Sequence, residues 1–130
     1  AAAVQCDAFV VDGGAEGWTA QRAVDELDVD GIEANWRNAF QGFTITGRGV
    51  TNFSSGPALL YEALSDNSPF GVPVSVVHAE AVDDGRTYAL ECVLDSAVAA
   101  DARPMIDFII ANFSTRSDGE CCIDPRDNRG

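Results

Sequence analysis

The sequence contains no lysine, and its formal positive charge comes from eight arginines alone. Against them stand 21 acidic residues, which give a net charge of −13. Such a charge repels nucleic-acid phosphates and anionic lipid surfaces at low salt. We therefore expect no nucleic-acid partner. The charge is compatible with a protein or glycan partner. An acidic surface can also serve only to keep the protein soluble.

Long apolar runs are also missing. No run approaches the roughly 18 residues that a spanning helix needs, so we expect no membrane span. The 130 residues suit one domain that is large enough to bury a core. We expect a single domain over residues 1–130, with an ordered core over about 4–113 and a polar tail over 114–130. The start Ala1-Ala2-Ala3-Val4 looks like a mature chain after removal of a signal peptide, although a trimmed chain would look the same.

Motifs for cofactors and catalysis are scarce. There is no C-x-x-C pair and no G-x-S-x-G nucleophile elbow, and the glycines at 13–17 lack the spacing and the lysine of a phosphate-binding loop. Residues 26–31 resemble the first half of a calcium-binding EF-hand loop, but Arg37 stands where the bidentate glutamate belongs. We expect no cofactor and no metal site.

Four cysteines are present, Cys6, Cys92, Cys121 and Cys122. This pattern in a chain of this size predicts disulfides and a secreted protein. A bond between the adjacent Cys121 and Cys122 would close a strained ring. We therefore expect one of these two to bond Cys6 and the other to bond Cys92, so that the tail is tied back to the domain. The N-F-S sequons at Asn52 and Asn112 are possible glycosylation sites on the same route.

The apolar periodicity predicts both strands and helices. Alternation over 4–11 indicates a strand, and 43–50 indicates a second strand with a bulge at its glycines. Helices are predicted to begin at Thr19 and at Asp30, the latter with Glu33 in a capping box and an end at Gly42. Pro57 predicts a third helix up to Leu64. A last helix is expected over 101–113, with Pro104 in its first turn.

The clearest local signal is a hairpin. Residues 72–82 and 87–94 flank Asp84-Gly85, a pair suited to a tight type I′ turn. The resulting register places Val77 opposite Cys92 on the core face, and His78 opposite Glu91 on the other face.

Together these elements predict a single-domain α+β fold. We expect an antiparallel sheet of about four strands, with three to four helices packed mainly on one face and with disulfide staples. The other face of the hairpin would then be partly exposed. We predict that Val74, Val76 and His78 on this face contact a partner, with Trp18 as a further contact, whereas the helical spacing of Trp36 assigns it to the core.

His78 is the only histidine, so any Ser-His or Cys-His mechanism would have to use it. With Glu80 or Glu91 it would form an acid–base set for a small hydrolase. We favour a structural cross-strand pair between His78 and Glu91, and a protein that is not an enzyme.

In size, cysteine content and apparent secretion, the chain resembles the small cysteine-containing proteins that filamentous fungi secrete, among them toxin-like proteins and host-directed effectors. The resemblance implies a secreted protein that acts by binding, and it carries no site residues. Two alternatives stay open. One is a secreted hydrolase that uses His78 with an acidic partner, and the other is an envelope or assembly subunit of a salt-adapted microbe. The sequence does not predict the oligomeric state.

Overall fold

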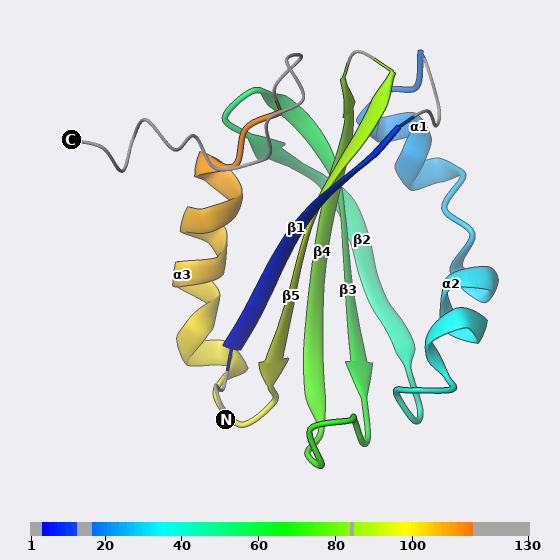
Figure 1. The fold of residues 1–130 in the computed structure, drawn as a ribbon, viewed down its shortest axis with the longest axis vertical. Helices are drawn as coiled ribbons and strands as arrows, with labels where there is room; N and C mark the ends of the chain where they lie inside the picture. The colour runs from blue at the N-terminus through cyan, green and yellow to red at the C-terminus, as the bar shows by residue number, and fades with distance from the viewer. Residues whose placement is uncertain (1–3, 13–16, 84, 116–130) are drawn as a thin grey trace.

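The computed structural model describes residues 4–12, 17–83 and 85–115. Within these ranges the chain forms one antiparallel sheet of five strands, in the order β1-β5-β4-β3-β2, together with three helices (Figure 1). The strands are β1 (Val4–Asp12), β2 (Thr44–Phe53), β3 (Gly56–Ser65), β4 (Val74–Asp83) and β5 (Arg86–Asp95), and the helices are α1 (Ala20–Asp25), α2 (Val29–Trp36) and α3 (Ala99–Asn112). The predicted α+β class is confirmed. No described helix is both long and apolar enough to cross a bilayer.

The fifth strand, β3, occupies the segment in which the sequence predicted a helix from Pro57 to Leu64. Gly56 begins β3 directly after the two-residue turn of the β2–β3 hairpin and pairs with Phe53, and its φ of +141° favours glycine. β3 lies inside the sheet between β2 and β4, and an apolar cluster packs on each face of the sheet, so side chains on both faces of β3 are buried. Its apolar residues are therefore nearly continuous and do not alternate with polar ones, a pattern that periodicity does not separate from a helix.

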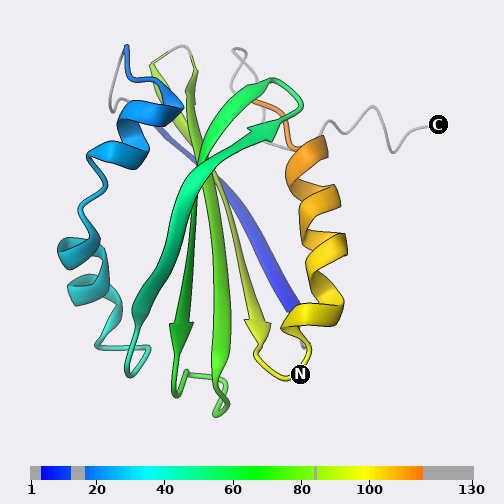
Figure 2. The same ribbon diagram turned by 180° about the vertical axis from the view of Figure 1, so that it is seen from behind.

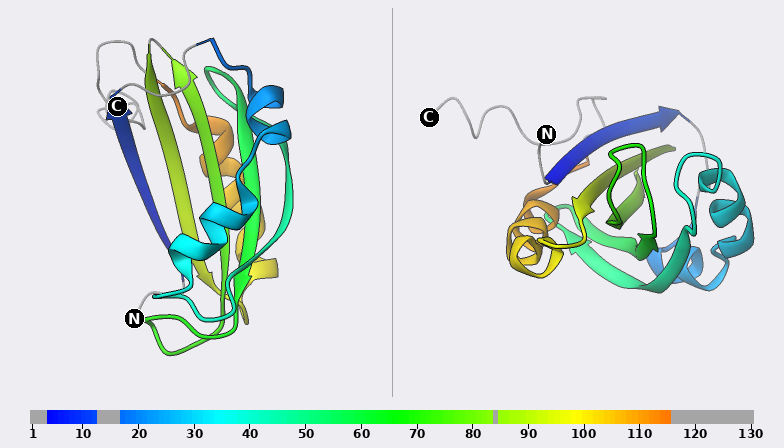
Figure 3. Two further views of the ribbon diagram at one scale, coloured as in Figure 1. Left: turned by 90° about the vertical axis from the view of Figure 1, so that its right-hand side faces the viewer. Right: turned by 90° about the horizontal axis from the view of Figure 1, so that it is seen from below.

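Helices cover both faces of the sheet, which corrects the expectation that they pack mainly on one. Alternate residues of β4 separate into two clusters. Val77 packs with Ile106 of α3, whereas Val76 packs with Phe40 and Trp36 at the end of α2. Figure 3 shows the sheet between α3 on one side and α1 with α2 on the other. We call these two sides the α3 face and the α1–α2 face.

The β2–β3 hairpin is joined to the end of α3. Seen from behind, it bends over toward the last turn of that helix (Figure 2). The backbone N–H and the hydroxyl of Ser54 both donate to the carbonyl of Phe113, each at 2.9 Å.

The α3 helix begins two residues before the predicted start, so Pro104 lies in its second turn and not in its first.

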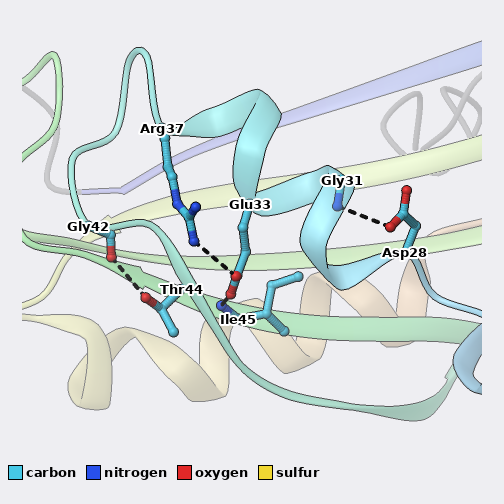
Figure 4. Close-up of polar contacts among 7 residues, drawn as sticks. All are labelled: Asp28, Gly31, Glu33, Arg37, Gly42, Thr44 and Ile45. Atoms are coloured by element: carbon cyan, nitrogen blue, oxygen red, sulfur yellow. Dashed lines mark hydrogen bonds and ion pairs between the residues drawn. The ribbon is translucent and has the colours of Figure 1, made fainter.

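The caps of α1 and α2 explain where these helices begin. The hydroxyl of Thr19 accepts a hydrogen bond from the backbone N–H of Arg22, as the sequence predicted for the start of α1. The α2 helix begins earlier than predicted, because Asp28 and not Asp30 caps it. The Asp28 carboxylate accepts the Gly31 N–H at 3.0 Å (Figure 4).

Glu33 does not close the predicted capping box. Its carboxylate accepts the backbone N–H of Ile45 at 2.8 Å and pairs with Arg37 at 3.3 Å, so it ties α2 to the start of β2 (Figure 4). The helix ends at Trp36, several residues before the predicted end at Gly42. Gly42 has a φ of +66° and lies in the turn that leads into β2.

The predicted β4–β5 register is confirmed, with Val77 opposite Cys92 and His78 opposite Glu91. The disulfide expectation for Cys6 and Cys92 is wrong. These two cysteines bond to each other, because β1 runs antiparallel beside β5 and places them at the same position of the register. The expected partners, Cys121 and Cys122, lie outside the described residues.

Candidate functional site

A charged cluster of three side chains lies on the α1–α2 face. His78 of β4 is buried, with 7% of its surface exposed. Its Nδ1 lies 2.8 Å from Oε2 of Glu91 on β5, and its Nε2 lies 2.7 Å from Oε1 of Glu80, two residues farther along β4. The structure thus brings together the three residues that the sequence singled out for acid–base chemistry. Among the described residues, no group of His, Cys, Asp and Glu side chains is arranged to hold a metal ion.

The surroundings of His78 determine its charge. Burial by itself lowers the pKa of His78, but the hydrogen bonds and negative charges of Glu80 and Glu91 outweigh it and raise the pKa to about 9. The ring is therefore an imidazolium at neutral pH and donates both of its N–H groups. In this state it has no lone pair with which to accept a proton.

The cluster belongs to a row of residues that crosses the whole sheet. The strand registers align Asp7, Glu91, His78, Tyr61 and Arg48, one from each strand. The Tyr61 ring stacks on the His78 ring, with centroids 4.6 Å apart and planes 16° apart. Burial, together with the negative charges of Glu91 and Glu80, raises the pKa of Tyr61, so its hydroxyl stays protonated. The neutral ring and the imidazolium form a cation–π contact.

A cavity of about 290 Å³ lies beside this cluster, between α1 and the sheet. Trp18, Ala23 and Leu27 line it from α1 and its flanks, and Leu59 and Val82 line it from β3 and β4. Its lining also includes three carboxylates, those of Glu26, Asp28 and Glu80. Glu80 therefore belongs both to the cavity and to the histidine cluster.

The apolar surface continues beyond the cavity toward β1. Phe9 and Val11 are 42% and 54% exposed. In the sheet register Phe9 is in line with Glu80, and Val11 is in line with Val82, so both lie on the α1–α2 face. The Phe9 ring centroid is 6.4 Å from that of His78. The helices of this face contact β2 and β3, and this leaves part of β1 and β5 uncovered.

Three of the four predicted contact residues, Val74, Val76 and His78, are buried. Val74 and Val76 are almost fully buried and pack with Phe40 and Phe43 beneath α2. The expectation of a contact there is wrong, because it assumed that the helices leave this face open. Trp18 is half-buried at the cavity.

The Arg22 guanidinium lies 4.2 Å above the Trp18 ring. The expected core position of Trp36 is confirmed, since it stacks on Phe43 within the apolar cluster beneath α2.

Both sequon asparagines are on the surface. Asn52 lies near the end of β2, and Asn112 is the last residue of α3 and donates to the carbonyl of Phe108. Their glycosylation stays a prediction.

Sequence reasoning missed the cavity and the exposed pair Phe9 and Val11. One signal was available. Both alternating sets of residues in β1 include apolar side chains, which is more than a strand with one solvated face needs. Which part of the face the helices leave open depends on the path of α1 and α2, and no local pattern encodes that path.

Comparison with known proteins gives information on the fold and none on the function. No protein-family model matches the chain, and no curated protein matches it. A crystal structure of PA94 from Pseudomonas aeruginosa, described as a protein of unknown function and a putative regulator, has a similar fold, with a TM-score of 0.53. The two chains are 12% identical over 86% of this chain and 83% of PA94.

Proposed function

We propose that this protein is a secreted, non-catalytic binding domain that holds a segment of a protein partner on its α1–α2 face. The observation that carries the proposal is the continuity of two apolar features. The exposed Phe9 and Val11 adjoin a cavity walled by Trp18, Leu27 and Leu59. Exposed apolar surface beside a concave site is typical of contact surfaces in soluble proteins.

The size of the cavity favours a polymer segment over a free small molecule. Sites for drug-sized ligands usually enclose about 300–1,000 Å³, so a cavity of about 290 Å³ is at the lower limit. It suits one or two side chains of a longer partner, and the rest of that segment would lie across Phe9 and Val11.

The hydrolase alternative is less well supported. Both nitrogens of His78 are held by carboxylates, and its pKa of about 9 keeps the ring protonated at neutral pH. Both N–H groups of this cation are used within the sheet itself, as expected of a structural cross-strand pair.

Peptide display tests the binding proposal. We would select a random peptide library on the wild-type protein and measure the dissociation constants of the enriched peptides. Two variants would then be compared, Ala23→Trp to fill the cavity and Phe9→Ser to remove the exposed ring. We expect enriched peptides to lose at least about tenfold in affinity for each, which corresponds to about 1.4 kcal/mol.

Phe108→Ser is the matched control. Phe108 is exposed on α3, on the opposite side of the sheet, and its replacement removes the same apolar group. We expect affinity within about twofold of wild type. Failure to enrich any peptide above an unrelated control protein, or equal losses for Phe9→Ser and Phe108→Ser, would overturn the proposal.

Secretion is the second part of the proposal, and the Cys6–Cys92 bond supports it because disulfides persist in oxidising compartments. The test is the intact mass of the natively produced protein, with and without reduction and alkylation. We expect the Cys6–Cys92 bond to give a deficit of about two mass units relative to the reduced chain, and we expect added hexose on Asn52 or Asn112. Four titratable thiols and an unmodified mass would contradict export.

A further inference from the structure

We infer that the cavity beside α1 takes a positively charged side chain of the partner, with a guanidinium preferred to an ammonium. Its carbon stem would lie against Trp18 and Leu27, and its charged head would lie beside Glu80. The inference rests on the proposed function, because it names the chemistry that the same site recognises.

The charge of the cavity lining is the first argument. Its carboxylates come from three different places in the chain, Glu26 after α1, Asp28 before α2, and Glu80 in the middle of β4. Among the described lining residues there is no arginine, lysine or histidine. A site with carboxylates and apolar walls favours a cation, because a neutral apolar group would partly desolvate the carboxylates without adding any attraction to them.

Glu80 is the carboxylate best placed to receive the cation. Its Oε1 accepts from His78 at 2.7 Å, and a carboxylate has further acceptor sites for a second donor. The Glu80 side chain is 34% exposed. His78 does not neutralise the cluster, because Glu91 occupies its other nitrogen, and two carboxylates then share one imidazolium.

The other two carboxylates already have partners. Glu26 pairs with Arg22 at 2.7 Å, and Asp28 accepts the Gly31 N–H at the start of α2. These bonds hold the two groups in place at the cavity. Arg22 offsets the charge of Glu26, so Asp28 adds the fixed negative charge while Glu80 supplies the hydrogen bond.

The aromatic wall explains the preference for a guanidinium. The Arg22 guanidinium lies 4.2 Å above the Trp18 ring, so this indole already stacks with a planar cation of the same chain. A guanidinium stacks on aromatic faces and donates through a rigid fork, whereas an ammonium is a compact and strongly hydrated charge. The apolar walls from Leu27 and Leu59 suit the carbon stem that either side chain carries.

Titration with three small probes tests the inference on the full chain. The probes are N-acetyl-arginine amide, its neutral isostere N-acetyl-citrulline amide, and N-acetyl-norleucine amide. Binding would be followed by amide and indole shifts in two-dimensional NMR spectra. We expect the arginine probe to shift the indole N–H of Trp18 and the amides of Ala23 and Glu80. The citrulline and norleucine probes should bind at least about tenfold more weakly.

A matched pair of variants distinguishes an effect of the site on binding from an effect of the protein's overall charge. Glu80→Gln and Asp101→Asn each remove one negative charge, and Asp101 is exposed at the start of α3 on the other side of the sheet. We expect Glu80→Gln to lower the affinity for the arginine probe by about tenfold, and Asp101→Asn to change this affinity by less than about twofold.

Three outcomes would overturn the inference. They are equal affinity for the arginine and citrulline probes, tighter binding of norleucine, and no shift at Trp18 with any probe. If the displayed peptides lose affinity for Ala23→Trp and Phe9→Ser but bind through neutral side chains, the inference is wrong and the proposed function still stands. The proposed function is also wrong if neither variant lowers the affinity of any enriched peptide.

Discussion

His78 shows how one residue couples charge to stability. The imidazolium is buried, bonds to Glu80 and Glu91, and stacks on Tyr61. Replacing it by glutamine removes the cation and leaves the two carboxylates on neighbouring strands without their shared partner. We expect His78→Gln to lower the free energy of unfolding at pH 6 by about 2–3 kcal/mol, measured by urea denaturation.

The same residue predicts how stability depends on pH. The folded pKa of about 9 lies above the value of 6.5 for an unperturbed histidine, so the folded state binds the proton more tightly. This contribution is fully present below about pH 6.5 and is lost as the pH rises through 9, with a total of about 3 kcal/mol. The difference in stability between wild type and His78→Gln should therefore shrink steadily from pH 6 to pH 10. A difference that stays constant over this range would contradict the assignment.

The sequence could predict the pairing within this cluster but not its burial. The turn at Asp84-Gly85 sets the register, and the register alone places His78 opposite Glu91. The period of two along a strand adds Glu80 on the same face. The rings of Tyr61 and Phe9 lie beside His78, and Tyr61 belongs to a segment that local signals assigned to a helix.

The β2–β3 hairpin shows how one element misled the prediction. Ser55-Gly56-Pro57 is a good helix start in isolation, and Leu60, Tyr61 and Leu64 have helical spacing. The alternative is stable because β3 lies between β2 and β4 and buries side chains on both faces. Such burial is a tertiary effect that outweighs the local preference.

Two glycines of this hairpin give a direct test of the strand assignment. Gly56 has a φ of +141°, whereas Gly49 has an ordinary φ and open space where a Cβ would point. We expect Gly56→Ala to destabilise the protein by about 1–3 kcal/mol through backbone strain. Gly49→Ala should leave stability within about 0.5 kcal/mol of wild type or raise it. Chemical denaturation of the two variants measures the contrast, and equal effects would mean that Gly56 does not have this positive φ.

At the scale of the whole molecule, the Cys6–Cys92 bond joins the first strand to the last. It spans 86 residues, so it constrains most of the chain in the unfolded state. In the chain-entropy model a loop of this length corresponds to about 4.6 kcal/mol, a large share of the roughly 5–15 kcal/mol of a typical domain's free energy of unfolding. The bond also secures β1, which lies at the edge of the sheet and pairs with β5 alone.

Replacing both cysteines by alanine should therefore have a global and a local effect. We would compare Cys6→Ala/Cys92→Ala with its parent in a background that carries Cys121→Ser and Cys122→Ser, so that no other thiol can exchange. The free energy of unfolding should fall by about 2–4 kcal/mol. Hydrogen exchange should accelerate most at the amides of β1, because an edge strand with one neighbour opens before the central strands. Equal acceleration in β1 and β4 would show that the bond acts only through the unfolded chain. No loss of stability in this background would show that the bond contributes little to the fold.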